Sequence, residues 1–478
     1  MDIMGVVSSA IQGITKSYGK RVGKKTTAPV INDVMPQTIK GDTYRLGFAT
    51  DEIMPQDFPN SVYWIAGHGS GHRMEGIISP VYISAVWLDC GADEGILWLT
   101  ADIVGLTNIE VTKIRSMIMA SEVIKGCKLI NFSCTHSHSG IDTLGYWGKP
   151  FASIPSDGKD KDYMEQLFNK AVKVSEEAFL NRQAGKLFAG QRAIPDGLDA
   201  GRLFADRHEV LSRIRFAPEN GENETWLINI GAHPNSLGGS NRKLSGEYPY
   251  FMREIIKEEK GANVHFGIGA IGGMDAPDFD KEDKLNCIKL QANFFAEHAM
   301  AVEEEKELVP EIKYIQQPFY LPVDNNVLCL LAMKGTMSFK AYPHYDSLLG
   351  IAMKTEITYM TFGDQKFLLL PGENFVNTVY GSYHSAEEST TGKGPEINPT
   401  PLAEICEDST MVAYGVSNDM SGYVVPPNDF ILNETQPFLN GGKDRFGKNH
   451  YHETNSMGIN TQKYIADAFQ KVVKNFNQ

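Results

Sequence analysis

Short apolar runs alternate with amphipathic segments along the first half of this chain, and this alternation limits the fold more than any other feature. Runs rich in β-branched and aromatic residues, each bounded by Gly, Asp or Lys, predict strands over 45–53, 80–89, 95–105 and 128–137. Between the last two, apolar residues three and four apart predict a helix over 109–124. This pattern predicts an α/β layered fold, with packed β-sheets flanked by helices in a single large domain.

The same pattern continues through the rest of the chain. Further strands are predicted over 186–192, 209–217, 225–234, 355–373 and 409–425. Further helices are predicted over 161–180, 247–261, 282–306 and 461–476.

Three segments depart from this regular pattern. Residues 1–40 predict a helical or irregular N-terminal arm, which leaves 41–478 as the large domain. The polar, Pro- and Gly-containing stretch 383–403 predicts a surface insertion. The acidic run Glu303–Glu307, at the end of the helix predicted over 282–306, indicates a solvated face and not a metal site.

Charge and composition exclude several classes of protein. A net charge of −14 argues against a nucleic-acid partner, because phosphate contacts need a basic surface. No run of about 20 apolar residues predicts a transmembrane helix. The first 25 residues lack the pattern of a secretory signal peptide, and the six cysteines form no CxxC pair. We therefore expect a cytoplasmic protein with free, buried thiols.

The strongest local motif is Thr135-His136-Ser137-His138-Ser139-Gly140, which follows an apolar strand. Catalytic groups collect where strands open into loops in α/β folds. In an extended segment, His136 and His138 would project from the same face, so that one could bind a metal while the other meets the substrate or a proton. A pair of hydrogen-bonded histidines without a function is an equal alternative from these residues alone.

Two other strand ends carry metal-ligating residue types. His233 ends the strand predicted over 225–234, and Pro234 stops the ladder there. Glu373 follows four apolar residues and a Pro-Gly pair. Taken singly, each of these residues is more typical of an ordinary loop or turn.

Four ordered motifs together resemble the N-terminal catalytic domain of the neutral/alkaline, non-lysosomal ceramidases. Residues 135–140 match the family's Thr-His-Thr-His-Ser-Gly, and residues 233–242, HPNSLGGSNR, follow its His-Pro-Thr-Ser-Met stretch. Pro-Gly-Glu stands at 371–373, and GVSNDMSGY at 415–423 follows the family's Gly-Leu-x-Asn-x-Tyr-x-x-Tyr. The opening stretch 67–89 is also similar. The resemblance extends from about Gly47 to Gly458.

The resemblance implies a Zn²⁺ site with one ligand from each motif: His136, His233, Glu373 and Tyr423. Two imidazoles with hard oxygen ligands suit zinc and leave a position for water. The family further implies that His138 contacts the substrate or moves a proton. By looser matches, Arg202 would steady an oxyanion and Tyr451 would line the site, although Arg202 fits a surface salt bridge equally well.

The sequence also departs from the family. Ala276 stands where the family has a serine that faces the zinc, so either Asp275 takes over its function or the reaction proceeds by metal-bound water alone on a different substrate. From the resemblance we also expect no counterpart of the family's C-terminal β-sandwich or of its secretory leader. The departures leave the identity of the substrate open.

The resemblance implies a zinc-dependent amidohydrolase of sphingolipid metabolism, which cleaves a linear, lipid-like N-acyl amide by a metal-activated water. Two alternatives stay open: a zinc hydrolase of another ester, lactone or small amide, and a catalytically silent metal-containing binding protein. The oligomeric state does not follow from the sequence.

Overall fold

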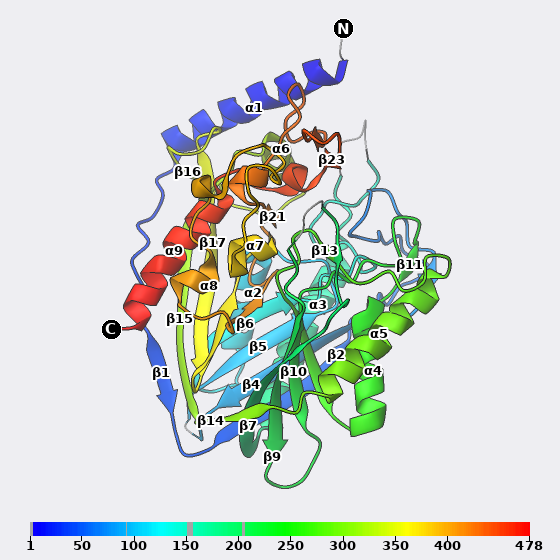
Figure 1. The fold of residues 1–478 in the computed structure, drawn as a ribbon, viewed down its shortest axis with the longest axis vertical. Coiled ribbons are helices and arrows are strands. Elements are labelled where there is room, and N and C mark those ends of the chain that lie inside the picture. Colours follow the sequence, from blue (N-terminus) through cyan, green and yellow to red (C-terminus); the bar gives the residue numbers. More distant parts are fainter. Residues whose placement is uncertain (1–2, 92, 151–155, 203–205) are drawn as a thin grey trace.

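The apolar runs form two β-sheets that pack face to face in the computed structural model, which describes residues 3–91, 93–150, 156–202 and 206–478 (Figure 1). Within these residues the larger sheet has nine strands, in the order β12-β10-β9-β7-β2-β4-β5-β6 with β14 beside β7. Its strands are β2 (Tyr44–Glu52), β4 (Tyr82–Asp89), β5 (Gly95–Ala101), β6 (Cys127–Cys134), β7 (Gln183–Ala193), β9 (Val210–Pro218), β10 (Thr225–Ile230), β12 (Asn263–Ile268) and β14 (Glu305–Leu308).

The smaller sheet has the order β1-β15-β17-β18-β20, and β16 pairs with β17. Most neighbouring strands are antiparallel, but β5–β6, β10–β12 and β18–β20 are parallel. The strands of the smaller sheet are β1 (Gln37–Lys40), β15 (Glu311–Pro322), β16 (Tyr342–Pro343), β17 (Ile351–Phe362), β18 (Gln365–Leu369) and β20 (Val412–Tyr414).

Aromatic side chains fill the layer between the two sheets. The Trp98 ring of the larger sheet lies 4.5 Å from the Tyr414 ring and 6.4 Å from the Phe367 ring of the smaller sheet. The Trp98 indole donates to Ser133 Oγ at 2.9 Å, so its polar edge stays paired in this buried layer. These strands are buried on both faces, which explains why they read as continuous apolar runs.

Helices cover the outer faces of both sheets (Figure 1). On the larger sheet, α3 packs on β2 and β4, α4 packs on β12, and α5 packs on β9. On the smaller sheet, Phe469 and Phe476 of α9 pack edge-on against Tyr359 of β17. The longer helices are α1 (Ile3–Lys25), α2 (Asn108–Met119), α3 (Lys161–Leu180), α4 (Glu247–Lys260), α5 (Lys284–Met300) and α9 (Thr461–Phe476), and the shorter ones are α6 (Asn326–Met333), α7 (Val376–Tyr380) and α8 (Leu402–Ile405).

Short two-stranded pairs and 3₁₀ turns surround one end of the two sheets. The parallel pairs are β3 (Gly76–Ile77) with β11 (Lys243–Leu244) and β19 (Glu373–Asn374) with β21 (Tyr423–Val424). The antiparallel pairs are β8 (Asp199–Ala200) with β13 (Met274–Asp275) and β22 (Gly442–Lys443) with β23 (Asn449–His450). The 3₁₀ turns are η1 (Pro395–Ile397), η2 (Pro427–Asp429) and η3 (His452–Asn455).

The predicted α/β layered fold is confirmed, but the helix predicted over 282–306 is wrong at its end. Helix α5 stops at Met300, and Glu305–Leu308 forms β14 beside β7. Glu303, Glu304 and Glu307 are exposed, as predicted for the acidic run, but the Glu305 carboxylate lies 2.9 Å from Arg213 and 2.7 Å from Arg215. Pairing with two cations of β9 overrides the local preference of an acidic run for water.

The arm predicted over 1–40 is bound to the large domain. Helix α1 packs on α6, and β1 adds an edge strand to the smaller sheet beside β15. In the insertion predicted over 383–403, Ser389 and Thr390 are buried, so this stretch is not wholly at the surface.

The sequence predicted neither disulfides nor transmembrane helices. None of the six cysteines, all of which fall in described parts of the chain, forms a disulfide. No helix among the described residues combines the length and apolar character needed to cross a bilayer.

Candidate metal centre

The four sequence motifs converge at one end of the two sheets. His136 follows β6 and His233 follows β10, both in the larger sheet. Glu373 follows β18, and Tyr423 lies beyond the end of β20, both in the smaller sheet. Loops that follow strand ends are the usual source of site residues in layered α/β folds. Segments that follow strands of both sheets therefore bring side chains to one place.

Glu373 lies between the two histidines of the larger sheet. Its Oε2 atom is 2.9 Å from Nε2 of His233 and 3.3 Å from Nε2 of His136. The second pair does not align as a hydrogen bond, which leaves the buried Nε2 of His136 without a hydrogen-bond partner. A buried polar atom without a partner is costly, and a cation between these three atoms would satisfy it.

Backbone carbonyls fix the orientation of both rings. His136 donates from Nδ1 to the Val104 carbonyl at 2.6 Å, and His233 donates from Nδ1 to the Met274 carbonyl at 2.8 Å. Such bonds set the tautomer and direct the Nε2 lone pair toward a metal. Both rings are therefore arranged as metal-ligating histidines are.

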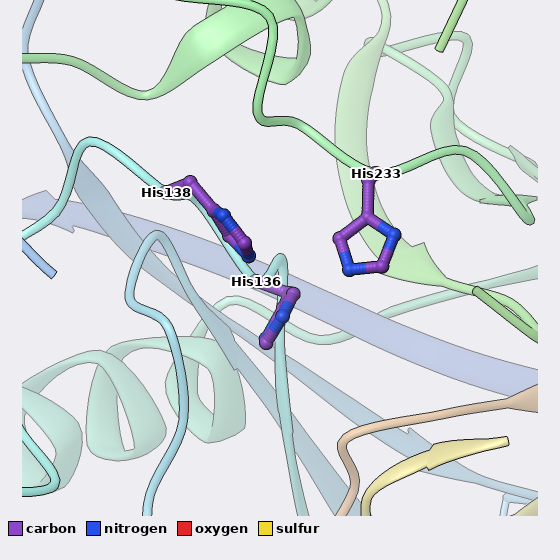
Figure 2. A group of neighbouring side chains, drawn as sticks. All are labelled: His136, His138 and His233. Atoms are coloured by element: carbon purple, nitrogen blue, oxygen red, sulfur yellow. The ribbon is translucent and has the colours of Figure 1, made fainter. Parts of the chain in front are cut away.

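His138 brings a third imidazole to the same place. Figure 2 shows His136 and His138 on one segment and His233 on another, with the three rings gathered together. Their ring centroids lie 4.8 to 5.3 Å apart, and one nitrogen from each ring falls within 4.8 Å of the others. Among the described residues, neither ring nitrogen of His138 has a hydrogen-bond partner. The three imidazoles together could hold a metal ion.

The backbone at His136 differs from the extended segment that we expected. His136 has φ of 61°, in the left-handed region that non-glycine residues rarely adopt. Strained residues of this kind concentrate at functional sites. The turn still brings the His136 and His138 rings together. Gly67 allows this approach, because a Cβ there would lie 2.4 Å from Cγ of His138.

Tyr423 reaches the site through a short strand pair. It is the register partner of Glu373 in the parallel strands β19 and β21. Its ring packs edge-on against His452 at 4.8 Å and Tyr451 at 6.2 Å. Burial raises the pKa of Tyr423 well above its ordinary value, and the Glu373 carboxylate raises it further. Tyr423 is therefore a neutral phenol in the protein alone.

Electrostatics also favour positive charge at the centre. Burial disfavours the charged form of Glu373, but the neighbouring His136 and His233 outweigh burial and hold its pKa well below the ordinary value. Burial lowers the pKa of His233, yet its hydrogen bond and attraction to Glu373 raise it overall. Burial and the adjacent imidazoles lower the pKa of His138 well below its ordinary value, so His138 is neutral.

A cavity of about 500 Å³ opens onto these side chains. Its polar wall includes His136, His138, Glu373, Tyr423 and Tyr451. Its apolar wall consists of Val104, Leu144, Trp147, Leu328, Met337, Met420 and Met457. A cavity that combines an apolar wall with several polar side chains fits a ligand that has both apolar and polar parts.

Arg202 does not line this cavity. Its Nε donates to Nδ1 of His450 at 2.9 Å, and its Nη2 donates to Glu453 at 2.6 Å. Within the described residues the pair is almost fully buried, with side-chain exposures of 4% and 1%. The predicted oxyanion role is therefore not supported by its position, because its guanidinium holds the turn that follows His450.

Asp275 also lies outside the cavity wall. Its Oδ1 accepts a hydrogen bond from Nδ2 of Asn235 at 2.7 Å, and its backbone bridges to that of His233. Asn235 itself lines the cavity. Asp275 therefore contacts the cavity wall through Asn235, and its charge also raises the pKa of His233. Ala276 is buried beside it and offers no hydroxyl.

Tyr451 is the most exposed of the predicted site residues, at 58%. Its ring stacks on His452 at 4.2 Å and lines the cavity. Burial of the phenol and the charges of Asp275 and Glu373 raise the pKa of Tyr451 to about 12. It therefore remains a proton donor at neutral pH.

His68 and Asn235 line the cavity but were not predicted as site residues. His68 lines the cavity with its ring 5.0 Å from that of His138, and its Nε2 lies 3.4 Å from the Asn235 carbonyl. Burial lowers the pKa of His68. The signal available was the run Ala66-Gly67-His68-Gly69-Ser70, where glycines flank a histidine in an irregular segment.

Comparisons with known proteins place the fold. The sequence matches no protein-family profile, and it matches no curated protein. Among solved structures, the neutral ceramidase from Pseudomonas aeruginosa aligns with 91% of this chain and 75% of its own, with a TM-score of 0.63 and 13% identity. A ceramidase complexed with C2 aligns with 91% of this chain and 76% of its own, with a TM-score of 0.65 and 13% identity. The chain therefore has the neutral ceramidase fold.

Proposed function

We propose that this protein is a zinc-dependent hydrolase that cleaves a linear amide bond in an N-acyl, ceramide-like substrate. The observation that carries the proposal is the convergence of His136, His233 and Glu373 at the end of an apolar cavity, with Nε2 of His136 unpaired. The likeness of the fold to two ceramidase structures supports the choice of substrate.

His136, His233, Glu373 and Tyr423 are the residues that would hold the ion. Two imidazoles, a carboxylate and a phenol oxygen form a donor set typical of zinc, and the bonds to Val104 and Met274 supply the outer support that ligating histidines need. Bound zinc would polarise a substrate carbonyl and lower the pKa of water toward about 7.

The remaining residues bind the substrate and move protons. His138, neutral and facing the cavity, is suited to take a proton from water and pass it to the leaving amine. The Tyr451 phenol can donate to the carbonyl oxygen. The apolar wall would hold the acyl chain and exclude water. Water is consumed, the C–N bond breaks, and a carboxylate and an amine are released.

Arg202 and Asp275 have supporting positions in this proposal. Arg202 holds Glu453 and His450 beside Tyr451, and Asp275 orients Asn235 through a hydrogen bond. We assign both residues to positioning, since neither lines the cavity.

Metal content and turnover, measured together, test this proposal. We expect about one zinc per chain, hydrolysis of short N-acyl amines, and loss of hydrolysis on chelation with recovery on zinc addition. His136→Ala is expected to lose the metal and to reduce turnover at least about a hundredfold. His298→Ala on α5 is the matched control, because that ring bonds only the Phe294 carbonyl of its own helix. Chelator-insensitive turnover or an active His136→Ala protein would refute the proposal.

A second substrate class is favoured by one observation. Ala276 is 3% exposed and stands where the family that this chain resembles has a serine facing the zinc, so that hydroxyl is missing here. Esters and lactones need less help with the leaving group than amides do, since an alkoxide leaves without prior protonation more readily than an amine. A panel of matched amide, ester and lactone substrates distinguishes the two classes by the ratio of kcat/KM values.

A further inference from the structure

Helix α1 carries a concentrated positive charge on an acidic protein. Lys16, Lys20, Arg21, Lys24 and Lys25 lie between Ile3 and Lys25 with no acidic residue, whereas the whole chain has a net charge of −14. Among the described residues, none of these five cations forms an ion pair with a carboxylate. Their charge is therefore directed to solvent.

The outer face of α1 also exposes apolar side chains. Val6 and Ile14 are 55% and 50% exposed, while Ile11 and Val22 are buried. At 100° per residue, Val6 and Lys24 project in the same direction to within about 10°. The solvent-facing side of this helix is thus both basic and apolar, which is the composition of helices that lie in a membrane interface.

A neighbouring turn extends this surface. The turn between β16 and β17 exposes Tyr345 at 92% and Leu348 at 70%. Among the described residues, Tyr345 is the most exposed aromatic side chain and Leu348 is the most exposed leucine. Gly19 brings α1 directly onto this turn, because a Cβ there would lie 1.7 Å from the Leu349 carbonyl oxygen. The acid of the turn, Asp346, accepts a hydrogen bond from the Tyr464 hydroxyl.

The position of α1 leaves this surface open. Figure 1 shows α1 as the outermost element at one end of the molecule, with β16 and α6 beneath it and β14 near the opposite end. Helix α6 separates α1 from the cavity: Leu328 of α6 lines the cavity and shares a hydrophobic cluster with Val22 of α1. One packed layer thus lies between the basic helix and the cavity.

We propose that α1 and the 344–350 turn form a docking surface for an anionic lipid bilayer. The cations of α1 are attracted to acidic headgroups, and Val6, Ile14, Tyr345 and Leu348 insert at the boundary of the acyl chains. Charge complementarity selects this partner. The anionic headgroups attract the cations of α1 and repel the rest of the protein, which is acidic. This inference goes beyond the proposed hydrolase activity and does not depend on it.

Vesicle flotation of the full chain tests the docking surface without any measurement of turnover. We expect binding to vesicles of phosphatidylcholine with about a third phosphatidylglycerol, little binding to phosphatidylcholine alone, and release in 0.5 M salt, where screening shortens to a few ångströms. Lys20→Gln with Lys24→Gln is expected to weaken binding roughly tenfold or more, and Leu348→Ser to weaken it severalfold.

Matched variants elsewhere on the chain serve as controls. Lys257→Gln with Lys260→Gln removes the same charge from the end of α4, and Val309→Ser removes an apolar side chain that is 66% exposed between β14 and β15. Neither control is expected to change binding. Absence of binding to acidic vesicles, or equal binding by the α1 variants, would overturn the proposal. Equal affinity for a short DNA duplex would also overturn it, because the surface would then be a general polyanion site.

Discussion

Glu373 and Tyr423 are register partners in two adjoining parallel strands of two residues each. This pairing aims both side chains into one cavity. Gly372 makes the close approach possible: its φ is 69°, and a Cβ there would lie 2.2 Å from the Gly422 carbonyl oxygen. We expect Gly372→Ala to reduce zinc affinity tenfold or more, because the clash displaces both oxygen donors.

Gly335→Ala is the control for that substitution. Gly335 also has positive φ, at 75°, but a Cβ there meets nothing within 4 Å. Each variant should lose about 1 kcal/mol of stability from the unfavourable backbone conformation, and Gly372→Ala should lose more because its Cβ meets the Gly422 carbonyl oxygen. Only Gly372→Ala should change the dissociation constant for zinc, measured by competition with a chromophoric chelator. Equal zinc affinity in the two variants would mean that the strand pairing does not position the ligands.

The two histidines of the Thr135–Gly140 motif should separate metal binding from catalysis. His138→Ala is expected to keep one zinc per chain and to lower kcat on an N-acyl amide by about 10²- to 10⁴-fold, the range for loss of a general acid or base. His136→Ala is expected to lose the metal itself. Elemental analysis beside steady-state kinetics checks both. A metal-free His138→Ala protein would instead identify all three imidazoles as ligands.

Glu305 should contribute more to stability than its neighbour Glu307. Glu305 pairs with Arg213 and Arg215, and its side chain is 11% exposed, whereas Glu307 pairs with Lys186 at 53% exposure. Removing one partner of a buried pair costs about 3 kcal/mol, and breaking an exposed pair costs at most about 1 kcal/mol. Urea unfolding of Glu305→Ala and Glu307→Ala measures both values. Similar losses would show that β14 is not anchored through this carboxylate.

The layered architecture and the strand ends could be predicted from the sequence because buried strands leave continuous apolar runs. Strand β15 was not predicted from the sequence, because Pro318 lowers the strand character of that segment. In the structure the β1 ladder pairs with residues 311–314 and does not reach Pro318, so the missing N–H of Pro318 removes no bond from that ladder. The helix predicted over 282–306 failed at Glu305 because two arginines from a distant strand determine where that carboxylate lies.

The candidate site was only partly accessible from the sequence. His136 and His233 stand directly after strands, where local patterns point to them. Tyr423 has no local signal, since its position depends on the pairing of β19 with β21. The burial of Arg202 against Glu453 joins residues that are 251 positions apart in the chain. Such contacts depend on tertiary structure, and no window of sequence contains them.

The buried carboxyl of Glu247 should make stability depend on pH. Burial raises its pKa to about 7, against the hydrogen bonds that it accepts from Ser139 and the Leu237 amide. Between its ordinary value of 4.5 and about 7, the unfolded chain releases the proton while the folded protein keeps it. The unfolded state then binds fewer protons, so this group lowers stability as the pH rises through that window.

Glu247→Gln should remove this dependence. From pH 4.5 to pH 8, the wild type is expected to lose on the order of 2 kcal/mol of unfolding free energy relative to Glu247→Gln. Urea denaturation across this range provides the measurement, with the exposed Glu258→Gln on the same helix as control. A constant difference would show that Glu247 is already ionised in the folded protein at pH 5.

The donor atoms at the proposed centre come from segments that follow different sheets: the imidazoles follow β6 and β10 of the larger sheet, and the carboxylate and phenol belong to the β19–β21 pair, which follows β18 and β20 of the smaller sheet. A cation bound by all four donors would link the segments that follow the larger sheet to those that follow the smaller sheet. Removing it would then loosen the seam between the sheets as well as the local loops. Amide hydrogen exchange in β6 and β18 would accelerate together, far beyond the few atoms that touch the ion.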